Sequence, residues 1–432
     1  MQFYSLNKQS PFVSFKEATI NGQAPDKGLY FPETIPQVKK ELITEIENRS
    51  NASIAFEVIK PYTGNTINDA DLFAIVEETI NFPIPLVNVS ENISTLELFH
   101  GPTLAFKDVG ARFMSRCLGY FVKDFDRKIT VLVATSGDTG GAVANGFYNV
   151  EGVDVVILYP SGKVSSVQEK QLTTLGNNVH ALEVNGSFDD CQQMVKQAFI
   201  DKELNKKLFL TSANSINVAR WLPQQFYYFF AYKQWKEKDN PPVISVPSGN
   251  FGNICAGLLA NSSGLPVKHF IAACNANDVV TRYLETENYQ PKKAIASISN
   301  AMDVGEPSNF IRILELFRQQ FNNLTTTLSS YSISDEKTRA TIKKVLEDKD
   351  YLTDPHGAVA YLALEKYLHS HPLEKGIFLE TAHPVKFYDV IEPVINSTVK
   401  IPGTVQAILN KEKVSRKMEA EFGALQHILL QL

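Results

Sequence analysis

The chain has 432 residues, of which 44% are hydrophobic and 21% are charged. These proportions are typical of a soluble globular protein, and the length allows two or three domains around a large core. With 42 basic and 47 acidic side chains, the net charge is −5, which argues against nucleic acid or an acidic membrane surface as the main partner. Any anion site must therefore be local.

The four cysteines, Cys117, Cys191, Cys255 and Cys274, lie far apart and form no C-x-x-C pair. No histidine cluster at metal-ligand spacing accompanies them, so we expect no metal site and a reducing, cytoplasmic environment. The N-terminus lacks a basic start followed by an apolar core, and no apolar run approaches the roughly 18 residues of a membrane span. We therefore expect a protein that is neither secreted nor membrane-inserted.

The first part of the chain, residues 1–85, alternates short apolar patches with turns and contains no catalytic constellation. One helix is predicted from Ile35 to Asn48, where Ile43 and Ile46 mark an apolar face. We interpret this part as an N-terminal capping domain.

From Leu86 onward, short runs rich in β-branched residues alternate with helical periods. Strands separated by helices predict an α/β fold, with parallel sheets, right-handed crossovers and helices on both faces. Ligands of such sheets bind just beyond the carboxyl ends of the strands, at a switch point in strand order. The predicted strands are Leu96 to Phe99, Ile129 to Ala134, Val153 to Tyr159, Asn178 to Val184, Leu208 to Thr211, Val243 to Val246, Val267 to Ala273 and Gly376 to Leu379.

Two amphipathic helices are predicted later in the chain, from Asn309 to Asn322 and from Ser334 to Leu346. Ser334 followed by acidic residues has the pattern of a helix start. We assign residues 86–395 to a two-part α/β catalytic region and residues 396–432 to a C-terminal packing appendage.

Lys107 lies at the centre of the stretch His100-Gly-Pro-Thr-Leu-Ala-Phe-Lys-Asp-Val-Gly110. Glycine and proline interrupt what precedes it, and the apolar period that follows predicts a helix with Lys107 in its first turn. The helix dipole at that position lowers the pKa of an amine, which favours a nucleophilic lysine. Taken alone, such a residue is more often an exposed lysine.

Two glycine turns follow predicted strands. Ser248-Gly-Asn-Phe-Gly-Asn253 leads into a helix, where backbone N–H groups can cradle an anion without a basic side chain. It matches neither the phosphate-loop nor the dinucleotide fingerprint. Thr135-Ser-Gly-Asp-Thr-Gly-Gly141 has the same order of strand, polar turn and helix. Its hydroxyl groups and backbone N–H groups can donate hydrogen bonds to a second anion.

These three stretches, together with Glu380-Thr-Ala-His-Pro-Val-Lys-Phe387, resemble the motif set of the threonine synthase family of fold-type-II pyridoxal-phosphate enzymes. The resemblance covers nearly the whole chain. Two positions depart from the family pattern: Lys27 stands where glycine is expected, and Gly357 stands where threonine is more usual. Further matching stretches are Asp26 to Pro32, Tyr159 to Ser166, Asn214 to Arg220 and Asp354 to His356.

The resemblance implies that Lys107 holds pyridoxal 5′-phosphate as a Schiff base and then moves protons. It implies that Thr381 is a neutral partner of the pyridine nitrogen, which suits elimination better than transamination. For Thr381 the alternative is a buried threonine bonded to a backbone carbonyl. The implied cradle for the cofactor phosphate consists of Ser248, Gly249, Asn250, Phe251, Gly252 and Asn253.

The substrate side is implied by the same resemblance. The turn that contains Ser136, Gly137, Asp138 and Thr139 would hold the substrate α-carboxylate through the hydroxyls of Ser136 and Thr139. Asp138 would repel that carboxylate, so we expect it to cap the helix or, alternatively, to orient the cofactor ring.

The substrate phosphate needs its own site. Arg220, Lys163 and the neutral Asn217 are the candidates, because guanidinium binds phosphate through two parallel hydrogen bonds. The alternative for both basic residues is an ordinary structural or surface role. His383 and Lys386 receive no role from the sequence.

The resemblance implies conversion of O-phospho-L-homoserine and water to L-threonine and phosphate. A related fold-type-II serine or threonine dehydratase is the alternative enzyme, and it needs no second phosphate site. An inactive homologue that binds the cofactor is a third possibility, against which the intact motifs weigh. The expected partner is a small-molecule substrate, and the sequence leaves monomer and homodimer open.

Overall fold

The larger of two parallel sheets carries the order β12-β11-β10-β13-β5-β4. Neighbouring strands run parallel, except that β4 pairs antiparallel with β5 at one edge. The structure, a computed structural model, describes residues 1–123, 125 and 128–432. The strands of this sheet are β4 (Leu86–Asn88), β5 (Ile93–Glu97), β10 (Val243–Pro247), β11 (His269–Cys274), β12 (Leu328–Ser332) and β13 (Gly376–Glu380).

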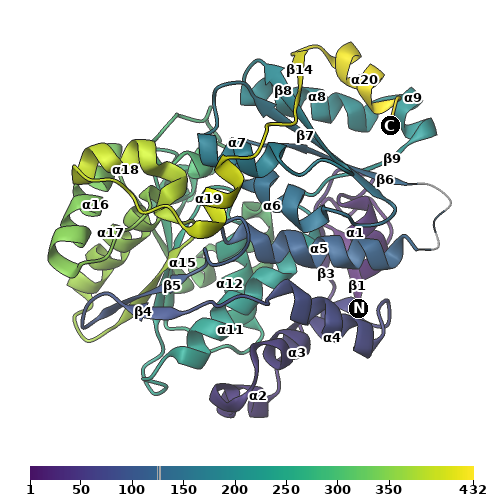
Figure 1. Ribbon diagram of the computed structural model, residues 1–432. Coiled ribbons are helices and arrows are strands. Elements are labelled where there is room, and N and C mark those ends of the chain that lie inside the picture. The colour runs from purple at the N-terminus through teal and green to yellow at the C-terminus, as the bar shows by residue number, and fades with distance from the viewer. Residues whose placement is uncertain (124, 126–127) are drawn as a thin grey trace.

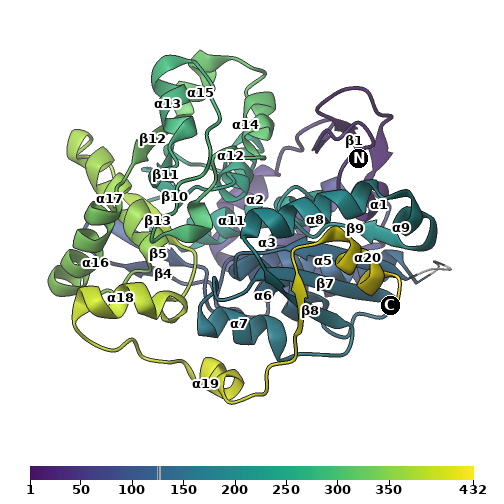
Figure 2. The same ribbon diagram turned by 90° about the horizontal axis from the view of Figure 1, so that it is seen from above.

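The second sheet has the order β14-β8-β7-β6-β9, with all neighbours parallel. Its central strands are apolar along nearly their whole length and are buried on both faces, as parallel sheets covered by helices require. The strands are β6 (Ile129–Ala134), β7 (Val153–Pro160), β8 (Val179–Asn185), β9 (Phe209–Thr211) and β14 (Arg416–Glu419). The two sheets form two lobes that lie side by side in Figure 2.

Helices cover both sheets. In the larger lobe α17 packs on β10, β11 and β13, while α11 and α12 pack against each other (Figure 1). In the second lobe α8 packs on β6 and β7, and α5 packs on α6. The helices are α5 (Lys107–Phe121), α6 (Asp138–Phe147), α7 (Ser166–Thr173), α8 (Phe188–Ile200), α9 (Lys202–Lys207), α10 (Val218–Trp221), α11 (Gln225–Gln234), α12 (Gly252–Ser262), α13 (Val279–Thr286), α14 (Phe310–Leu316), α15 (Phe321–Thr327), α16 (Asp335–Lys349), α17 (Pro355–Ser370), α18 (Tyr388–Ile395), α19 (Gly403–Leu409) and α20 (Phe422–Leu429), with 3-10 turns η2 (Leu222–Gln224), η3 (Asn300–Met302) and η4 (Pro384–Phe387).

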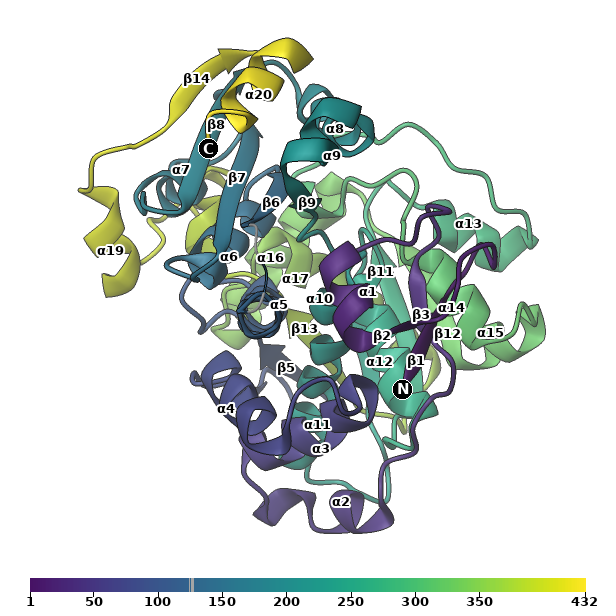
Figure 3. The same cartoon turned by 90° about the vertical axis from the view of Figure 1, so that its right-hand side faces the viewer.

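The N-terminal part forms a small antiparallel sheet, order β2-β1-β3, and α1 packs between this sheet and α5 (Figure 3). Phe15 anchors it, because its ring packs against those of Phe113 and Phe121 on α5. The elements are β1 (Gln2–Ser5), β2 (Val13–Ser14), α1 (Phe15–Asn21), β3 (Tyr30–Pro32), α2 (Lys40–Thr44), η1 (Ile46–Asn48), α3 (Asn51–Thr63) and α4 (Asp69–Thr79).

Each sheet has a switch point in strand order, as the sequence predicts. In the larger sheet β10 is followed outward by β11 and β12, whereas β13 lies on its other side; in the second sheet β6 separates β7 from β9 in the same way. The motif at Ser248 follows β10, Thr381 follows β13, and Thr135 follows β6. The fold therefore gathers the predicted motifs at two switch points, where α/β proteins bind ligands.

The predicted strands are confirmed to within about three residues at each end. The helix predicted from Asn309 to Asn322 is wrong as one element: Arg318 and Gln319 adopt positive φ of 53° and 58° and break it into α14 and α15. The helix predicted from Ile35 is shorter, starting at Lys40. The helix at Ser334 is confirmed, with Ser334 as its N-cap.

Within the described residues, no helix combines the length and apolar character needed to cross a membrane.

Candidate active site

Lys107 is the first residue of α5, and two backbone contacts fix its position. The N–H of the preceding residue, Phe106, donates to the carbonyl of Thr381 at 2.9 Å, and Ala105 forms an isolated bridge with Ala382. Asp108, buried in the first turn, accepts hydrogen bonds from the N–H and hydroxyl of Thr103. The reactive lysine is thus placed by the ends of β5 and β13 together.

The ammonium of Lys107 lies 3.5 Å from Asp138 Oδ2, while that of Lys386 lies 2.8 Å from Asp138 Oδ1. Burial lowers the pKa of Lys107, and Asp138 opposes this shift. The sequence predicts the same direction, but from the helix dipole and not from burial. The nearby charges of Lys386 and Arg220 lower the pKa of Lys107 further. Burial would raise the pKa of Asp138, but Lys386 and then Lys107 outweigh it and hold that pKa well below its ordinary value.

The turn from Ser248 to Asn253 has the properties of an anion cradle. Phe251 is the N-cap of α12 in the left-handed conformation, with φ 60°. In the described chain, the backbone N–H groups from Gly249 to Ile254 donate to no protein atom. The buried Nδ2 of Asn253 also lacks a partner among these residues. Several N–H donors at a helix N-terminus bind a phosphate well.

A glycine is required at one end of this cradle. A Cβ at Gly249 would lie 2.7 Å from Met302 Cα and 2.9 Å from the carbonyl oxygen of Ala301, on η3. The neighbouring Asn250 side chain donates to Ser215 Oγ at 2.6 Å. This contact joins the cradle to the segment that leads to Arg220.

Two adjacent tyrosines on α11 connect the cradle to the reactive lysine. The Tyr228 hydroxyl donates to Asn253 in the cradle at 2.9 Å, and the Tyr227 hydroxyl donates to the carbonyl of Phe106. Both rings are buried. No sequence motif marks these two tyrosines as site residues, although the unbroken aromatic run of α11 indicates a helix that is buried on all sides.

The second glycine turn follows β6. Thr135 Oγ1 accepts from the N–H groups of Gly137 and Gly140 at 3.0 and 2.8 Å, and so closes the turn. Ser136 and Thr139 are half-buried, and their hydroxyls make no hydrogen bond within the described residues. They remain available to a ligand.

The expectation that Asp138 caps α6 is wrong. Gly137 is the N-cap, with no side-chain cap, and Asp138 is the first helical residue. Its carboxylate turns instead toward Lys386 and Lys107, and Gln168 Nε2 donates to it at 3.0 Å. Charge neutralisation by the two lysines also removes most of the expected repulsion between Asp138 and a substrate carboxylate.

Thr381 follows β13 and is 6% exposed. Its hydroxyl has no partner among the described residues, so the alternative of a hydroxyl bonded to a backbone carbonyl is not found. The adjacent Glu380 is fully buried on the opposite side of the strand, where Asp354 N–H donates to it. Gly357 is required there, because a Cβ at that position would lie 1.6 Å from Glu380 Oε2. This contact leaves no room for a side chain at position 357.

Arg220 and Asn217 lie on one short segment but differ in how many of their side-chain hydrogen-bonding groups already have a partner. Arg220 is 3% exposed; one Nη donates to the Ala213 carbonyl, and its Nε has no partner in the described chain. Burial lowers the pKa of Arg220 to about 10. Asn217 caps α10 through Oδ1 and donates from Nδ2 to Thr19 O at 2.9 Å. Its amide is therefore engaged in the fold, which argues against the predicted contact with substrate.

Lys163 lies on the exposed turn after β7 and makes no side-chain contact to a protein acid among the described residues. Lys163 is thus exposed, whereas the other predicted site residues are buried or half-buried. Lys386, which is fully buried, joins them as a member that the sequence left without a role. Its signal was its position inside a recognised motif, only five residues after Thr381. No group of three acidic, histidine or cysteine side chains in the described chain could hold a metal ion.

Comparison with known proteins gives a consistent result along the chain. Family models described as "Pyridoxal-phosphate dependent enzyme", "Threonine synthase N terminus" and "Threonine synthase, C-terminal" match residues 88–380, 2–80 and 357–429. The threonine synthase of Haemophilus influenzae is 46% identical, with 100% of both chains covered. The crystal structure of threonine synthase from Escherichia coli superposes with a TM-score of 0.92 at 42% identity, covering 100% of both chains. That of the enzyme from Brucella melitensis with bound pyridoxal phosphate gives 0.93 at 34% identity, covering 100% of this chain and 99% of the other.

Proposed function

This chain belongs to the threonine synthase family of pyridoxal-phosphate-dependent enzymes, and we propose that Lys107 and the two anion sites around it convert O-phospho-L-homoserine and water to L-threonine and phosphate. The observation that carries the proposal is the grouping of a half-buried lysine of lowered pKa with an uncharged N–H cradle and a separate buried arginine. A dehydratase needs only the first two of these features.

The residues present fit pyridoxal phosphate. The unpartnered N–H groups from Gly249 to Ile254 suit its phosphate, the Lys107 amine suits its aldehyde, and the free hydroxyl of Thr381 suits its pyridine nitrogen. When bound, the cofactor supplies an electron sink for negative charge on the substrate carbons. A hydroxyl partner leaves that sink milder than a carboxylate would.

Lys107 is the proton carrier in this proposal. Its lowered pKa leaves a fraction of the amine neutral and able to take the α-proton of the substrate, which a fully charged ammonium could not do. The same amine then passes protons at Cβ while phosphate leaves from Cγ and water adds at Cβ. Because Lys107 begins a helix anchored at Thr381 and Phe106, it stays within reach of successive positions.

The substrate is held by its two anionic ends. The hydroxyls of Ser136 and Thr139 and the N–H groups of their turn bind the α-carboxylate. Arg220 binds the phosphate through its free guanidinium nitrogens, with Lys163 as a further candidate on an exposed turn. Asn217 is left out of this set because its amide is already bonded within the fold.

The surroundings of the protein follow from the same chemistry. All four cysteines are free and buried, which agrees with a reducing cytoplasm. The partner is the small-molecule substrate, and the net charge of −5 gives no reason to add nucleic acid.

A product assay tests the proposal. The purified protein with pyridoxal phosphate is mixed with O-phospho-L-homoserine, and separately with L-serine and L-threonine, and phosphate, threonine and keto acid are measured. We expect phosphate and threonine in equal amounts from the first substrate. Keto acid from serine or threonine, with no threonine from phosphohomoserine, would favour the dehydratase, and no product from any substrate would favour an inactive homologue.

A further inference from the structure

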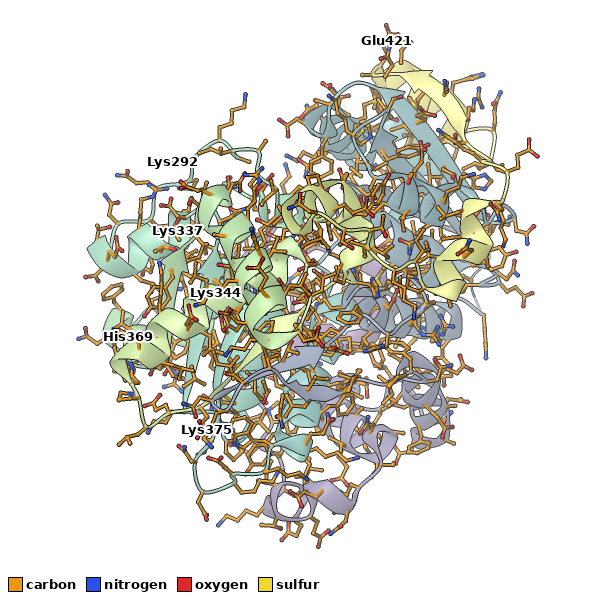
Figure 4. All side chains as sticks on the ribbon, turned by 60° about the vertical axis from the view of Figure 1, so that its left-hand side comes forward. Lys292, Lys337, Lys344, His369, Lys375 and Glu421 are labelled. Atoms are coloured by element: carbon orange, nitrogen blue, oxygen red, sulfur yellow. The ribbon has the colours of Figure 1, made fainter. Side chains whose placement is uncertain are left out.

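Lys386 is a lysine in an unusual position. Lysines such as Lys292 and Lys337 extend from the surface in Figure 4, whereas the Lys386 side chain is 0% exposed. A buried ammonium has a large desolvation cost unless it is paired and hydrogen-bonded. Its position within the site therefore calls for a role that the proposed function has not given it.

The ammonium of Lys386 makes two contacts, at 2.8 Å each. One joins it to Asp138 Oδ1 and the other to the carbonyl of Thr103. Lys386 belongs to η4, which follows β13 of the larger sheet, whereas Asp138 begins α6, which follows β6 of the second sheet. The ion pair thus bridges the two lobes at the reactive lysine.

Electrostatics connect this bridge to the chemistry of Lys107. Asp138 alone, 3.5 Å from the Lys107 ammonium, would stabilise the charged amine and make it a poor nucleophile and base. Lys386 occupies the other carboxylate oxygen and cancels the charge of Asp138. The pair leaves Lys107 next to a site of nearly zero net charge, where burial dominates.

We propose that Lys386 is a positioning residue for the reaction: its buried ammonium aims Asp138 at Lys107 across the lobe boundary and cancels the carboxylate charge that would otherwise keep Lys107 protonated. The inference rests on the role of Lys107 in the proposed function. It assigns Lys386 no contact with cofactor or substrate.

The test measures the protonation of Lys107 directly. Cofactor is removed from the full-length chain, and the rate of Lys107 acetylation by a trace of acetic anhydride is followed against pH by peptide mass spectrometry. Recovery of the visible absorbance after pyridoxal phosphate is added back checks that the chain is folded. Lys292 and Lys337 serve as exposed references in the same sample.

We expect Lys386→Met to raise the pH midpoint of Lys107 acetylation by about 1 to 3 units, because an unopposed carboxylate favours the ammonium. Asp138→Asn should lower the midpoint, and the double variant should return close to the wild type. Lys413→Met is the matched control, because it removes a lysine that forms ion pairs with Glu169 and Glu183 in the second lobe. This variant should leave the pH midpoint of Lys107 acetylation unchanged.

An unchanged or lowered midpoint in Lys386→Met would overturn the proposal and reduce Lys386 to a support of the fold. If that variant does not fold, the comparison moves to the Asp138→Asn background, where no uncompensated carboxylate remains and loss of Lys386 should still raise the midpoint. Failure of the proposed function itself would be seen separately, as a Lys107→Ala variant that keeps the visible absorbance of the bound cofactor.

Discussion

Arg220 is the residue that separates the two enzyme chemistries compatible with this fold. Only a substrate that carries its own phosphate needs a second phosphate site, and Arg220 offers a buried guanidinium whose Nε is unpaired in the described chain. It lies close enough to lower the pKa of Lys107. Its backbone packs against Gly110 on α5, where an added Cβ would lie 2.7 Å from the Arg220 carbonyl oxygen.

Replacing Arg220 by alanine should leave the visible absorbance of the bound cofactor nearly unchanged, because the cradle holds the cofactor phosphate. The kcat/KM for phosphohomoserine should fall by about one to two decades, the value of a charge-assisted hydrogen bond of roughly 1.5–3 kcal/mol. Arg220→Lys should regain part of this loss. Equal losses with phosphohomoserine and with an unphosphorylated slow substrate would mean that Arg220 only supports the fold.

Gly252 tests the cradle. Its added Cβ would lie 3.3 Å from Asn309 Nδ2, and a valine there would cover the N–H groups at the start of α12. We expect Gly252→Val to weaken binding of pyridoxal phosphate, measured by absorbance titration, with the far-UV circular dichroism retained. Gly403→Val is the control, since Gly403 also begins a helix but has no heavy atom within 4 Å of its added Cβ. Equal affinity in both variants would place the cofactor phosphate elsewhere.

At the scale of elements, the contact between β13 and α17 depends on a buried acid. Burial raises the pKa of Glu380 well above its ordinary value, and the nearby carboxylates of Asp354 and Glu97 act in the same direction. Its Oε2 has no partner among the described residues. Burial therefore favours the protonated form of this carboxyl group in the folded chain.

This proton makes stability depend on pH. Above about pH 4.5, the ordinary pKa of glutamate, the unfolded chain releases the proton that the folded chain keeps, so the contribution of Glu380 falls as pH rises toward its folded pKa. We expect the free energy of unfolding, from denaturant titrations at pH 5, 6 and 7, to decrease with rising pH more steeply in the wild type than in Glu380→Gln, by at most about 1.4 kcal/mol per pH unit. Parallel pH profiles would show that Glu380 does not hold the proton.

The fit between the two elements predicts a coupled pair of substitutions. Gly357→Ala places a methyl group against Glu380 Oε2 and should destabilise the protein by about 1–3 kcal/mol, as overpacking does. Glu380→Ala should restore most of that loss in the double variant. Gly423→Ala, in the first turn of α20 with open space around it, should have little effect. Additive losses in the Gly357 and Glu380 double variant would contradict the contact.

The elements that could be predicted from sequence are those with one dominant local signal. The strand at Ile129 is a continuous buried run made mostly of β-branched residues, and its bounds are confirmed to the residue. By contrast, β12 is LSSYS and β14 is RKME, polar edge strands whose pairing with β11 and β8 depends on segments far away in the chain. The break between α14 and α15 could not be predicted, because no glycine or proline lies at that point in the sequence.

For the whole molecule, the motif resemblance indicates which residues carry the chemistry but not which contacts they make with one another. The sequence predicts Lys107, the cradle and Thr381 beyond strand ends, and the structure places them after the adjacent strands β5, β10 and β13 of the larger sheet. The Asp138–Lys386 pair was not foreseen, because it joins residues from different lobes and only the fold brings them together. Likewise, the Asn217 amide is already hydrogen-bonded because it donates to the carbonyl of Thr19 in the N-terminal part, a contact that only the fold reveals.

At this scale, the lobes meet around one amine. The larger sheet supplies the cradle, Thr381 and Lys386, while the second sheet supplies Asp138 and the turn for the substrate carboxylate. Lys107 on α5 lies where these contributions converge, held by Thr381 on one side and facing Asp138 on the other. The proposed reaction therefore requires that Lys107 is the amine that holds the cofactor.

The most direct test is to treat the protein with bound pyridoxal phosphate with borohydride, digest it and locate the pyridoxyl group by mass spectrometry. Borohydride fixes the cofactor to the amine to which it is bonded, so the label should be found on Lys107, and Lys107→Ala should remain folded, carry no label and have negligible turnover. A pyridoxyl group on Lys386 or Lys163, or a label retained in Lys107→Ala, would contradict the account.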